Sequence, residues 1–230
     1  MTGAFGRRVL AELVGTAFLT MAVIGSGIAA SRLSPGDTGL QLLENSVVTG
    51  AVLVALILAL QPISAAFNPV VTLIERSLGA FGTGAAVRLI AAQSIGGALG
   101  AVLANLMFGL PAVRLASQHR SGSGLWLGEV IATAGLVLVI FGSARSGRSD
   151  RVAYTVGGYI TAAYWFTSST SFANPAVTLA RTLSDTFAGI APASAAVFVL
   201  MQLVGGALGW LLVRLLYPSA LPARQEVPAS

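Results

Sequence analysis

The chain carries two nearly identical octapeptides, AFNPVVTL at residues 66–73 and FANPAVTL at residues 172–179. Asparagine is a strong helix N-cap, and proline suits the first helical turn because its missing N–H would have no partner there. Each octapeptide therefore predicts the start of a helix. Both lie in an almost continuously apolar sequence, which places these starts at membrane depth. Lipid does not tolerate the unpaired backbone groups of a helix start, whereas a water-lined cavity does, so the pair predicts a pore.

The composition is that of an integral membrane protein. Hydrophobic residues make up 55% of the 230 residues and charged residues only 9%, whereas soluble domains carry about 25% charged residues. The net charge is +5, and all basic residues are arginine. A positive charge can indicate binding to nucleic acid, but these arginines follow the pattern of membrane topology described below, which argues against nucleic acid as a partner. The chain has no cysteine and a single histidine, His119, so we expect no disulfide, no metal site, no cofactor and no enzyme activity.

Apolar runs long enough to cross about 30 Å of hydrocarbon occur six times along the chain. They lie at residues 9–30, 47–64, 84–108, 125–143, 152–168 and 193–217. The first follows two arginines, as in a signal peptide, but its length and the internal Glu12 favour a span. Two shorter apolar segments, 68–78 and 174–183, would rise only about 16 Å as helices. The expected fold is thus an all-α membrane protein with six transmembrane helices and two half-helices.

The two halves of the chain repeat each other. QSIGGALG at residues 93–100 corresponds to QLVGGALG at 202–209, at nearly the same offset as the Asn-Pro segments. We therefore predict one channel domain, 1–217, with repeats at 7–108 and 124–217, and a disordered tail at 218–230. Three spans per repeat invert one repeat relative to the other, which places a shared site near the bilayer midplane. The glycine runs indicate close helix packing, with a flexible hinge as the alternative.

Arginine counts in the short loops predict the orientation in the membrane. If both termini are cytoplasmic, the inner side receives nine arginines and the outer side four. The inner group is Arg7, Arg8, Arg76, Arg88, Arg145, Arg148, Arg151, Arg214 and Arg224; the outer group is Arg32, Arg114, Arg120 and Arg181.

Two carboxylates, Glu12 and Glu129, lie inside the first and fourth spans. Ionisable residues inside a membrane are costly and functional by default. One interpretation is a proton relay. We favour the other, in which each carboxylate accepts hydrogen bonds from the irregular loop before a half-helix, because such loops have backbone N–H groups that need acceptors. Gln93 and Gln202, in spans three and six, are expected to support the same loops.

The order of spans, half-helices and Asn-Pro starts resembles the major intrinsic protein family, the aquaporins and glycerol channels, over about residues 7–217. The resemblance implies that the half-helices enter from opposite faces and abut at the midplane, with Asn68 and Asn174 presenting amides to the lumen. It also implies a homotetramer with one pore per protomer. The motif residues implied by the resemblance are Asn68, Pro69, Val70, Asn174, Pro175 and Ala176.

The sequence departs from that family at the outer constriction. Most members have arginine three residues after the second asparagine, and this chain has Val177. Arg181 comes one helical turn later. One interpretation places it over the pore; we favour the other, a pair with Asp185 at spacing i+4. Counting from the asparagines assigns the other filter positions to Thr49, Ala162, and either Ser171 or Thr170. Such a selectivity filter is wide and free of arginine.

The predicted function is a passive channel for small neutral solutes larger than water. Residues 159–175 with Val177 are similar to a bacterial subgroup associated with metalloids, which implies arsenous acid, glycerol or water as solute and the bacterial inner membrane as location. The alternative is an ion-coupled secondary transporter with broken helices. A transporter needs a coupling-ion site, for which only Glu12 and Glu129 qualify.

Overall fold

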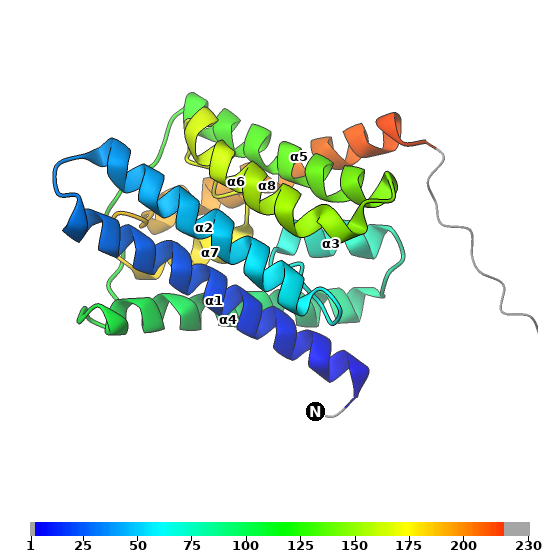
Figure 1. The fold of residues 1–230 in the computed structure, drawn as a ribbon, viewed down its shortest axis with the longest axis horizontal. Helices are drawn as coiled ribbons and strands as arrows, with labels where there is room; N and C mark the ends of the chain where they lie inside the picture. Colours follow the sequence, from blue (N-terminus) through cyan, green and yellow to red (C-terminus); the bar gives the residue numbers. More distant parts are fainter. Residues whose placement is uncertain (1–2, 219–230) are drawn as a thin grey trace, which may run out of the picture.

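A computed structural model describes residues 3–218, and within them every regular element is a helix (Figure 1). The predicted tail lies, from residue 219 onward, outside the described residues. In chain order the elements are α1 (Ala4–Leu33), α2 (Thr38–Leu60), α3 (Pro69–Ser77), α4 (Thr83–Met107), α5 (Ser123–Arg145), η1 (Ser149–Arg151), α6 (Val152–Phe166), α7 (Pro175–Ala180), η2 (Arg181–Leu183) and α8 (Pro192–Leu216).

Five of the described helices, α1, α2, α4, α5 and α8, are long and apolar enough to cross a membrane. The predicted span 152–168 corresponds to α6, which has 15 residues and would rise only about 22 Å. The 3₁₀ turn η1 precedes it directly and lengthens the helical segment. The two predicted half-helices are α3, with 9 residues, and α7, with 6 residues followed by η2. The all-helical fold class predicted from the sequence is confirmed.

Helix α2 begins nine residues before the apolar run that predicts it. Asp37 is the N-cap, and its side chain accepts a hydrogen bond from the Leu40 N–H at 2.9 Å. The polar first turns of α2 are stabilised by α1, since the buried Asn45 amide donates to the Val23 carbonyl at 2.8 Å. Hydropathy alone misses this helical extension because the polar side chains are satisfied within the protein.

Glycine allows the most extensive helix contacts, which are between α1 and α4 and between α5 and α8. A Cβ atom added at any of four glycines would collide with a backbone carbonyl of the facing helix. In the first half these are Gly96 against Leu13 and Gly100 against Ala17; in the second half they are Gly205 against Val130 and Gly209 against Ala134. The glycine runs therefore serve close packing, as predicted.

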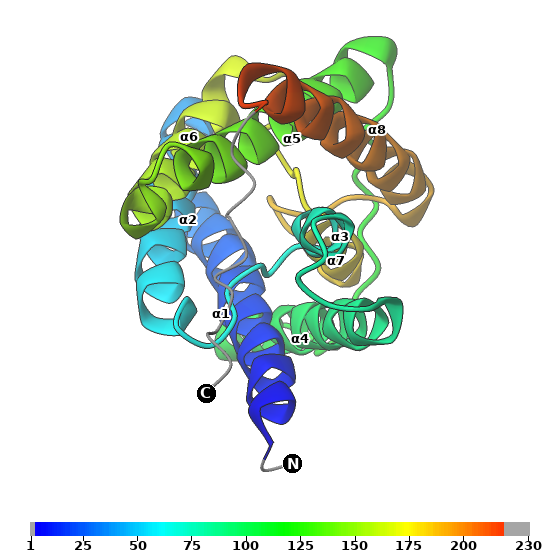
Figure 2. The same cartoon turned by 90° about the vertical axis from the view of Figure 1, so that its right-hand side faces the viewer.

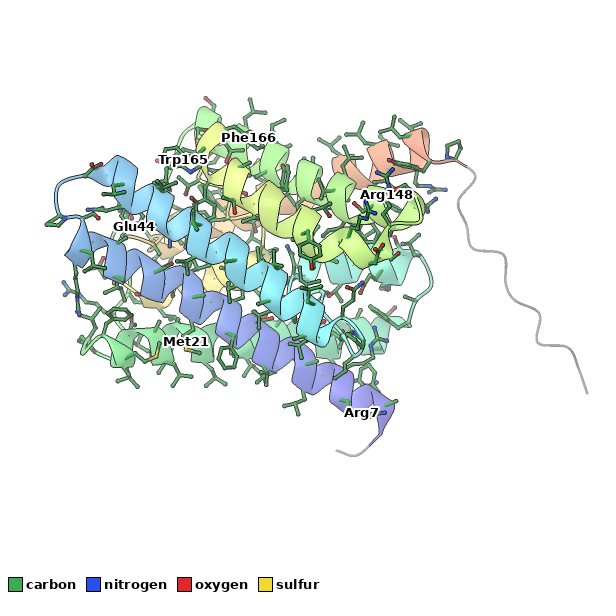
Figure 3. The ribbon with its side chains drawn as sticks, viewed as in Figure 1. Arg7, Met21, Glu44, Arg148, Trp165 and Phe166 are labelled. Carbon is green, nitrogen blue, oxygen red and sulfur yellow. The ribbon has the colours of Figure 1, made fainter. Side chains whose placement is uncertain are left out.

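The long helices surround the two half-helices. Viewed from the end of the bundle, α3 and α7 lie together inside a ring formed by the other helices (Figure 2). The first turn of α1 and the last turn of α8 lie at the same end of the bundle (Figure 1). Arg7 and Arg148, both assigned to the inner side, also lie at this end, whereas Glu44, Trp165 and Phe166 lie toward the other (Figure 3).

Candidate functional site

The two asparagines cap the half-helices, as the sequence predicts. The Asn68 side-chain oxygen accepts a hydrogen bond from the Val70 N–H at 3.0 Å. The Asn174 oxygen accepts from the N–H groups of Ala176 and Val177 at 3.1 and 3.3 Å. Capping in this way leaves the amide nitrogen of each asparagine free to donate elsewhere.

Both amide nitrogens donate across the junction between the two halves. Asn68 Nδ2 donates to the Ala173 carbonyl at 2.8 Å, and Asn174 Nδ2 donates to the Phe67 carbonyl at 2.7 Å. Phe67 and Ala173 both have φ of 48°. Non-glycine residues keep this costly conformation only where their surroundings fix it. The reciprocal hydrogen bonds hold the two helix starts against each other and leave each amide a second N–H.

Glu12 supports the loop before α3. Its carboxylate accepts hydrogen bonds from the Ser64 hydroxyl at 2.6 Å, the Ala66 N–H at 2.9 Å and the Phe67 N–H at 2.7 Å. Gln93 Nε2 donates to the same carboxylate at 2.8 Å. The fully buried Glu12 side chain is thus occupied by a loop scaffold, which is the interpretation that the sequence favours.

Glu129 supports the loop before α7 in the same manner. It accepts hydrogen bonds from the N–H groups of Phe172 and Ala173 at 2.9 and 3.1 Å. Gln202 Nε2 donates to Glu129 at 2.6 Å and to the Thr178 hydroxyl at 2.8 Å, which ties the scaffold to the half-helix. Neither glutamate lines the cavity described next.

A cavity of about 330 Å³ runs past both asparagines. Its wall extends from Arg8, in the first turns of α1, to Arg181, after α7. Much of the wall between them is apolar, including side chains of α1, α2 and α6: Leu19, Val23, Leu53, Ile57, Val156 and Ile160. Asn68 and Asn174 therefore present polar groups to a mostly apolar passage.

Three of the predicted filter residues, Thr49, Ser171 and Val177, lie in this wall and are buried. The Thr49 hydroxyl lies 3.2 Å from the Tyr164 hydroxyl, which also faces the cavity. The buried Ser171 hydroxyl has no hydrogen-bond partner among the described residues. The wall at this level is thus formed by small and hydroxyl-bearing side chains.

The structure places Ala162 and Thr170 away from the wall. Ala162 is therefore not a filter residue, and of the two alternatives Ser171 and Thr170 it is Ser171 that lines the cavity. Ala162 lies on the exposed face of α6. The cavity face of α6 is spaced four residues apart and includes Ile160 and Tyr164, so a position two residues from either points elsewhere. Thr170 is half-buried, and its neighbour Ser171 takes the place in the wall.

The four other motif residues do not line the cavity but pack behind the residues that do. Pro69, Val70, Pro175 and Ala176 are buried but do not line the cavity. They are the first two residues of each half-helix, where the asparagine before them faces the passage. Their contribution is the geometry of the helix start.

Arg181 lies in the cavity wall, and the predicted ion pair with Asp185 is wrong. Asp185 pairs with Arg114 instead, at 3.2 Å. Arg181 is only 3% exposed, its Nε donates to the Ala188 carbonyl, and its guanidinium stacks 3.4 Å from the centre of the Phe172 ring. The description of the filter as free of arginine therefore holds at position 177 but not for the whole wall.

Asp185 is held in the outer loop by other partners. The backbone N–H and the hydroxyl of Ser117 both donate to it at 2.9 Å. These two hydrogen bonds, with a smaller contribution from Arg114, hold the pKa of Asp185 below its ordinary value. The carboxylate is thus committed to loop structure and is not available to the cavity.

The half-helices present equivalent faces to the cavity. Val71 and Glu75 follow Asn68 at the same spacing as Val177 and Arg181, the first residue of η2, follow Asn174, and all of them line the wall. The signal that could have identified Arg181 and Glu75 is this helical spacing, because residues four apart share a face. Counting three residues from the second asparagine finds Val177, but it does not reach Arg181, which lies one helical turn further along the same face.

Two half-helices that meet start to start beside one cavity define a class of membrane channels. Residues 2–170 match the Major intrinsic protein family, and the chain belongs to this family. It is 44% identical over 224 residues to aquaglyceroporin AqpS of Rhizobium meliloti strain 1021, covering 96% of this chain and 95% of that protein. The protein is therefore a passive membrane channel and not an enzyme.

The fold is also similar to a solved structure. The X-ray structure of the aquaglyceroporin from Plasmodium falciparum matches with a TM-score of 0.70 and 20% sequence identity, covering 94% of this chain and 96% of that one. At this identity the likeness concerns the fold alone. It agrees with the arrangement of long helices around two half-helices (Figure 2).

Proposed function

We propose that the chain conducts small uncharged polyhydroxyl solutes, namely glycerol and arsenous acid together with water, through a wide filter at Val177 and Thr49. The observation that carries this proposal is the pair of small side chains that two different helices contribute to the cavity wall, Thr49 on α2 and Val177 on α7. Neither fills the passage as an aromatic or arginine side chain would. The similarity to a protein described as an aquaglyceroporin supports the same solute class.

The asparagines favour neutral solutes with hydroxyl groups. Each caps a half-helix whose dipole places partial positive charge near the helix start. A hydroxyl oxygen can accept a hydrogen bond from the second N–H of Asn68 or Asn174, whereas a cation is repelled by both dipoles. Uncharged solutes that exchange hydrogen bonds with water therefore cross at low cost.

The secondary transporter is the weaker proposal. Its coupling ion would need a carboxylate on the passage beside the helix starts, and Glu12 and Glu129 do not line the cavity. Glu75 lines it, but in the last turn of α3, away from Asn68. Glu12 and Glu129 are engaged by backbone N–H groups and by Gln93 and Gln202. Their symmetric use as scaffold supports passive conduction.

We further propose a homotetramer in the bacterial inner membrane, with both termini in the cytoplasm and repeats at 7–108 and 124–217. The arginine counts and the shared end of α1 and α8 support this orientation. Light scattering of the purified protein in mild detergent tests the assembly. A monomer with full solute flux would contradict it.

Flux of a solute panel into proteoliposomes tests the proposed function. We expect swelling with glycerol and uptake of arsenous acid well above those of empty liposomes, and no change when an ionophore removes the proton gradient. Collapse of glycerol flux with the gradient would favour the transporter. Flux of water alone would contradict the wide filter.

A further inference from the structure

Arg181 differs from the other arginines of residues 3–218 in its surroundings. It is almost completely buried, yet it lines the cavity together with Tyr164 and Phe172. Its Nε is held by the Ala188 carbonyl, and no hydrogen bond joins Nη1 or Nη2 to any described residue. A buried guanidinium that lines a passage and has N–H donors without partners can interact with a permeating solute through its charge and its hydrogen bonds.

No carboxylate of the described residues neutralises this charge. The ion pairs found among them join Arg114 to Asp185 and Arg151 to Asp150. Glu129, the carboxylate inside α5, is occupied by two backbone N–H groups and Gln202. Arg181 therefore remains a fixed positive charge in the wall.

A second arginine adds to this charge from the loop between α4 and α5. Its guanidinium, that of Arg120, lies 5.2 Å from the centre of the same Phe172 ring. Arg120 Nε donates to the Gly189 carbonyl at 3.2 Å, which anchors it beside the loop after η2. Phe172 thus holds two guanidinium groups near one end of the cavity by cation–π contact, which favours ordered positions for both.

The position of Arg181 on its half-helix gives it a direct relation to the filter. It comes one helical turn after Val177, on the same face, so the two side chains lie one after the other along the passage. Val177 with Thr49 limits width without charge. Arg181 brings charge at a different depth.

We propose that Arg181 supplies the fixed charge that excludes cations, one helical turn beyond the size-limiting pair Val177 and Thr49. The pore then selects size and charge at two separate places. This inference rests on the proposed function, because it concerns the selectivity of the same passage. Repulsion between a permeating cation and Arg181 is several times stronger in a partly dry protein cavity than in bulk water. Phe172 is the positioning residue that keeps the guanidinium in place.

Urea and guanidinium provide a matched pair of solutes for the test, since they are planar, similar in size and differ in charge. Fluxes of both are measured in proteoliposomes of the full chain and of R181Q. We expect R181Q to raise the guanidinium-to-urea flux ratio by about tenfold, because glutamine keeps much of the side-chain volume and removes the charge. An unchanged ratio would overturn the proposal.

R114Q is the matched control. Arg114 belongs to the outer loop, its side chain is 70% exposed, and it lies outside the cavity wall. It loses the same charge as R181Q and should leave the ratio at the wild-type value. An equal rise in R114Q would assign the effect to surface charge and overturn the role of Arg181.

Two further variants keep the proposal testable if R181Q does not fold. F172L retains the arginine but removes the ring that positions it, and F172W retains a ring. We expect F172L to raise the guanidinium-to-urea ratio and F172W to keep it low. Equal ratios in both variants would count against positioning by Phe172 and against the proposal.

The double variant V177R/R181Q separates this inference from the proposed function. It moves the charge to position 177, so guanidinium exclusion should return while glycerol flux falls. If the double variant still conducts guanidinium, a fixed charge at the filter does not control cations and the proposal fails. Failure of the wild type to conduct any neutral solute would instead contradict the proposed function.

Discussion

The half-helices α3 and α7 begin alike and end differently. Both start at a capping asparagine whose amide reaches the other half, and both are supported by a buried glutamate and glutamine. Seven residues after the asparagine, however, α3 carries Glu75, whereas η2, directly after α7, carries Arg181, and both line the cavity. The shared part builds the passage, and the part that differs gives its two ends different chemistry.

This comparison separates scaffold from selectivity. Residues that maintain the meeting point of the half-helices occur in both halves and are engaged in hydrogen bonds with loops. Residues that discriminate between solutes need not be matched, because the two mouths face different compartments. Substitutions of the first kind should therefore act equally in both halves, and those of the second kind should act in one half only.

The largest expected effect is loss of the buried carboxylates. E12A and E129A each leave at least two buried backbone N–H groups without an acceptor, at about 1–3 kcal/mol for each group. Both variants should lose folded protein, measured as yield of the monodisperse protein in detergent and as Tm. E44A is the control, because Glu44 is at the bundle end and accepts from Ser34. If only one of the two variants lost yield and Tm, the Glu12 and Glu129 scaffolds would not be equivalent.

The next effect concerns the filter. V177R places a guanidinium with five donors where the wall now has an aliphatic side chain, and we expect glycerol and arsenous acid flux to fall about tenfold relative to water. T49F should act in the same direction through size alone. V177L is the control for a modest increase in volume. If neither V177R nor T49F changes the ratio of glycerol to water, these residues do not line the constriction.

Helix packing should show a smaller and symmetric effect. G96A and G205A bring a methyl group against the carbonyls of Leu13 and Val130, and overpacking of this kind costs about 1–3 kcal/mol. Thermal unfolding in detergent should show similar losses of Tm in both. G158A, where added volume meets nothing, serves as control and should keep or raise Tm. A much larger loss in one half would indicate that the packing is not equivalent.

The smallest effect on stability is expected from Asp185 in the outer loop, which lies outside the two half-helices compared above. The pKa of Asp185 is lowered by Ser117, so its contribution to stability is present above the unfolded pKa of about 4 and is lost as pH falls through the lower folded value. Wild type should exceed D185N in Tm at pH 7, and the difference should shrink below pH 4. A difference independent of pH would exclude the carboxylate as its cause.

Much of the scaffold could be predicted from the sequence. The Asn-Pro starts, the intramembrane glutamates and the glycine runs carry local rules of capping, burial and packing that do not depend on the rest of the fold. The start of α2 could not be read from hydropathy, because Asn45 is satisfied by the Val23 carbonyl of another helix. Such long-range hydrogen bonds leave no local pattern.

The filter was predictable only in part. Thr49, Ser171 and Val177 were found by counting from the asparagines, but Ala162 was not at the wall because the count does not fix the rotation of α6. For Arg181, the i+4 spacing favoured a pair with Asp185 over a place at the pore, although Arg114 from a distant loop occupies that carboxylate. Competition between partners far apart in sequence decides which charges remain free.

The most direct test of the account is chemical block of the passage, which the absence of cysteine makes possible. V177C and the outer-loop control H119C are reconstituted, and glycerol flux is measured before and after a negatively charged methanethiosulfonate reagent. The account predicts that labelled V177C loses most of its glycerol flux and labelled H119C keeps it. Full glycerol flux through V177C whose labelling has been verified would contradict conduction between the half-helices.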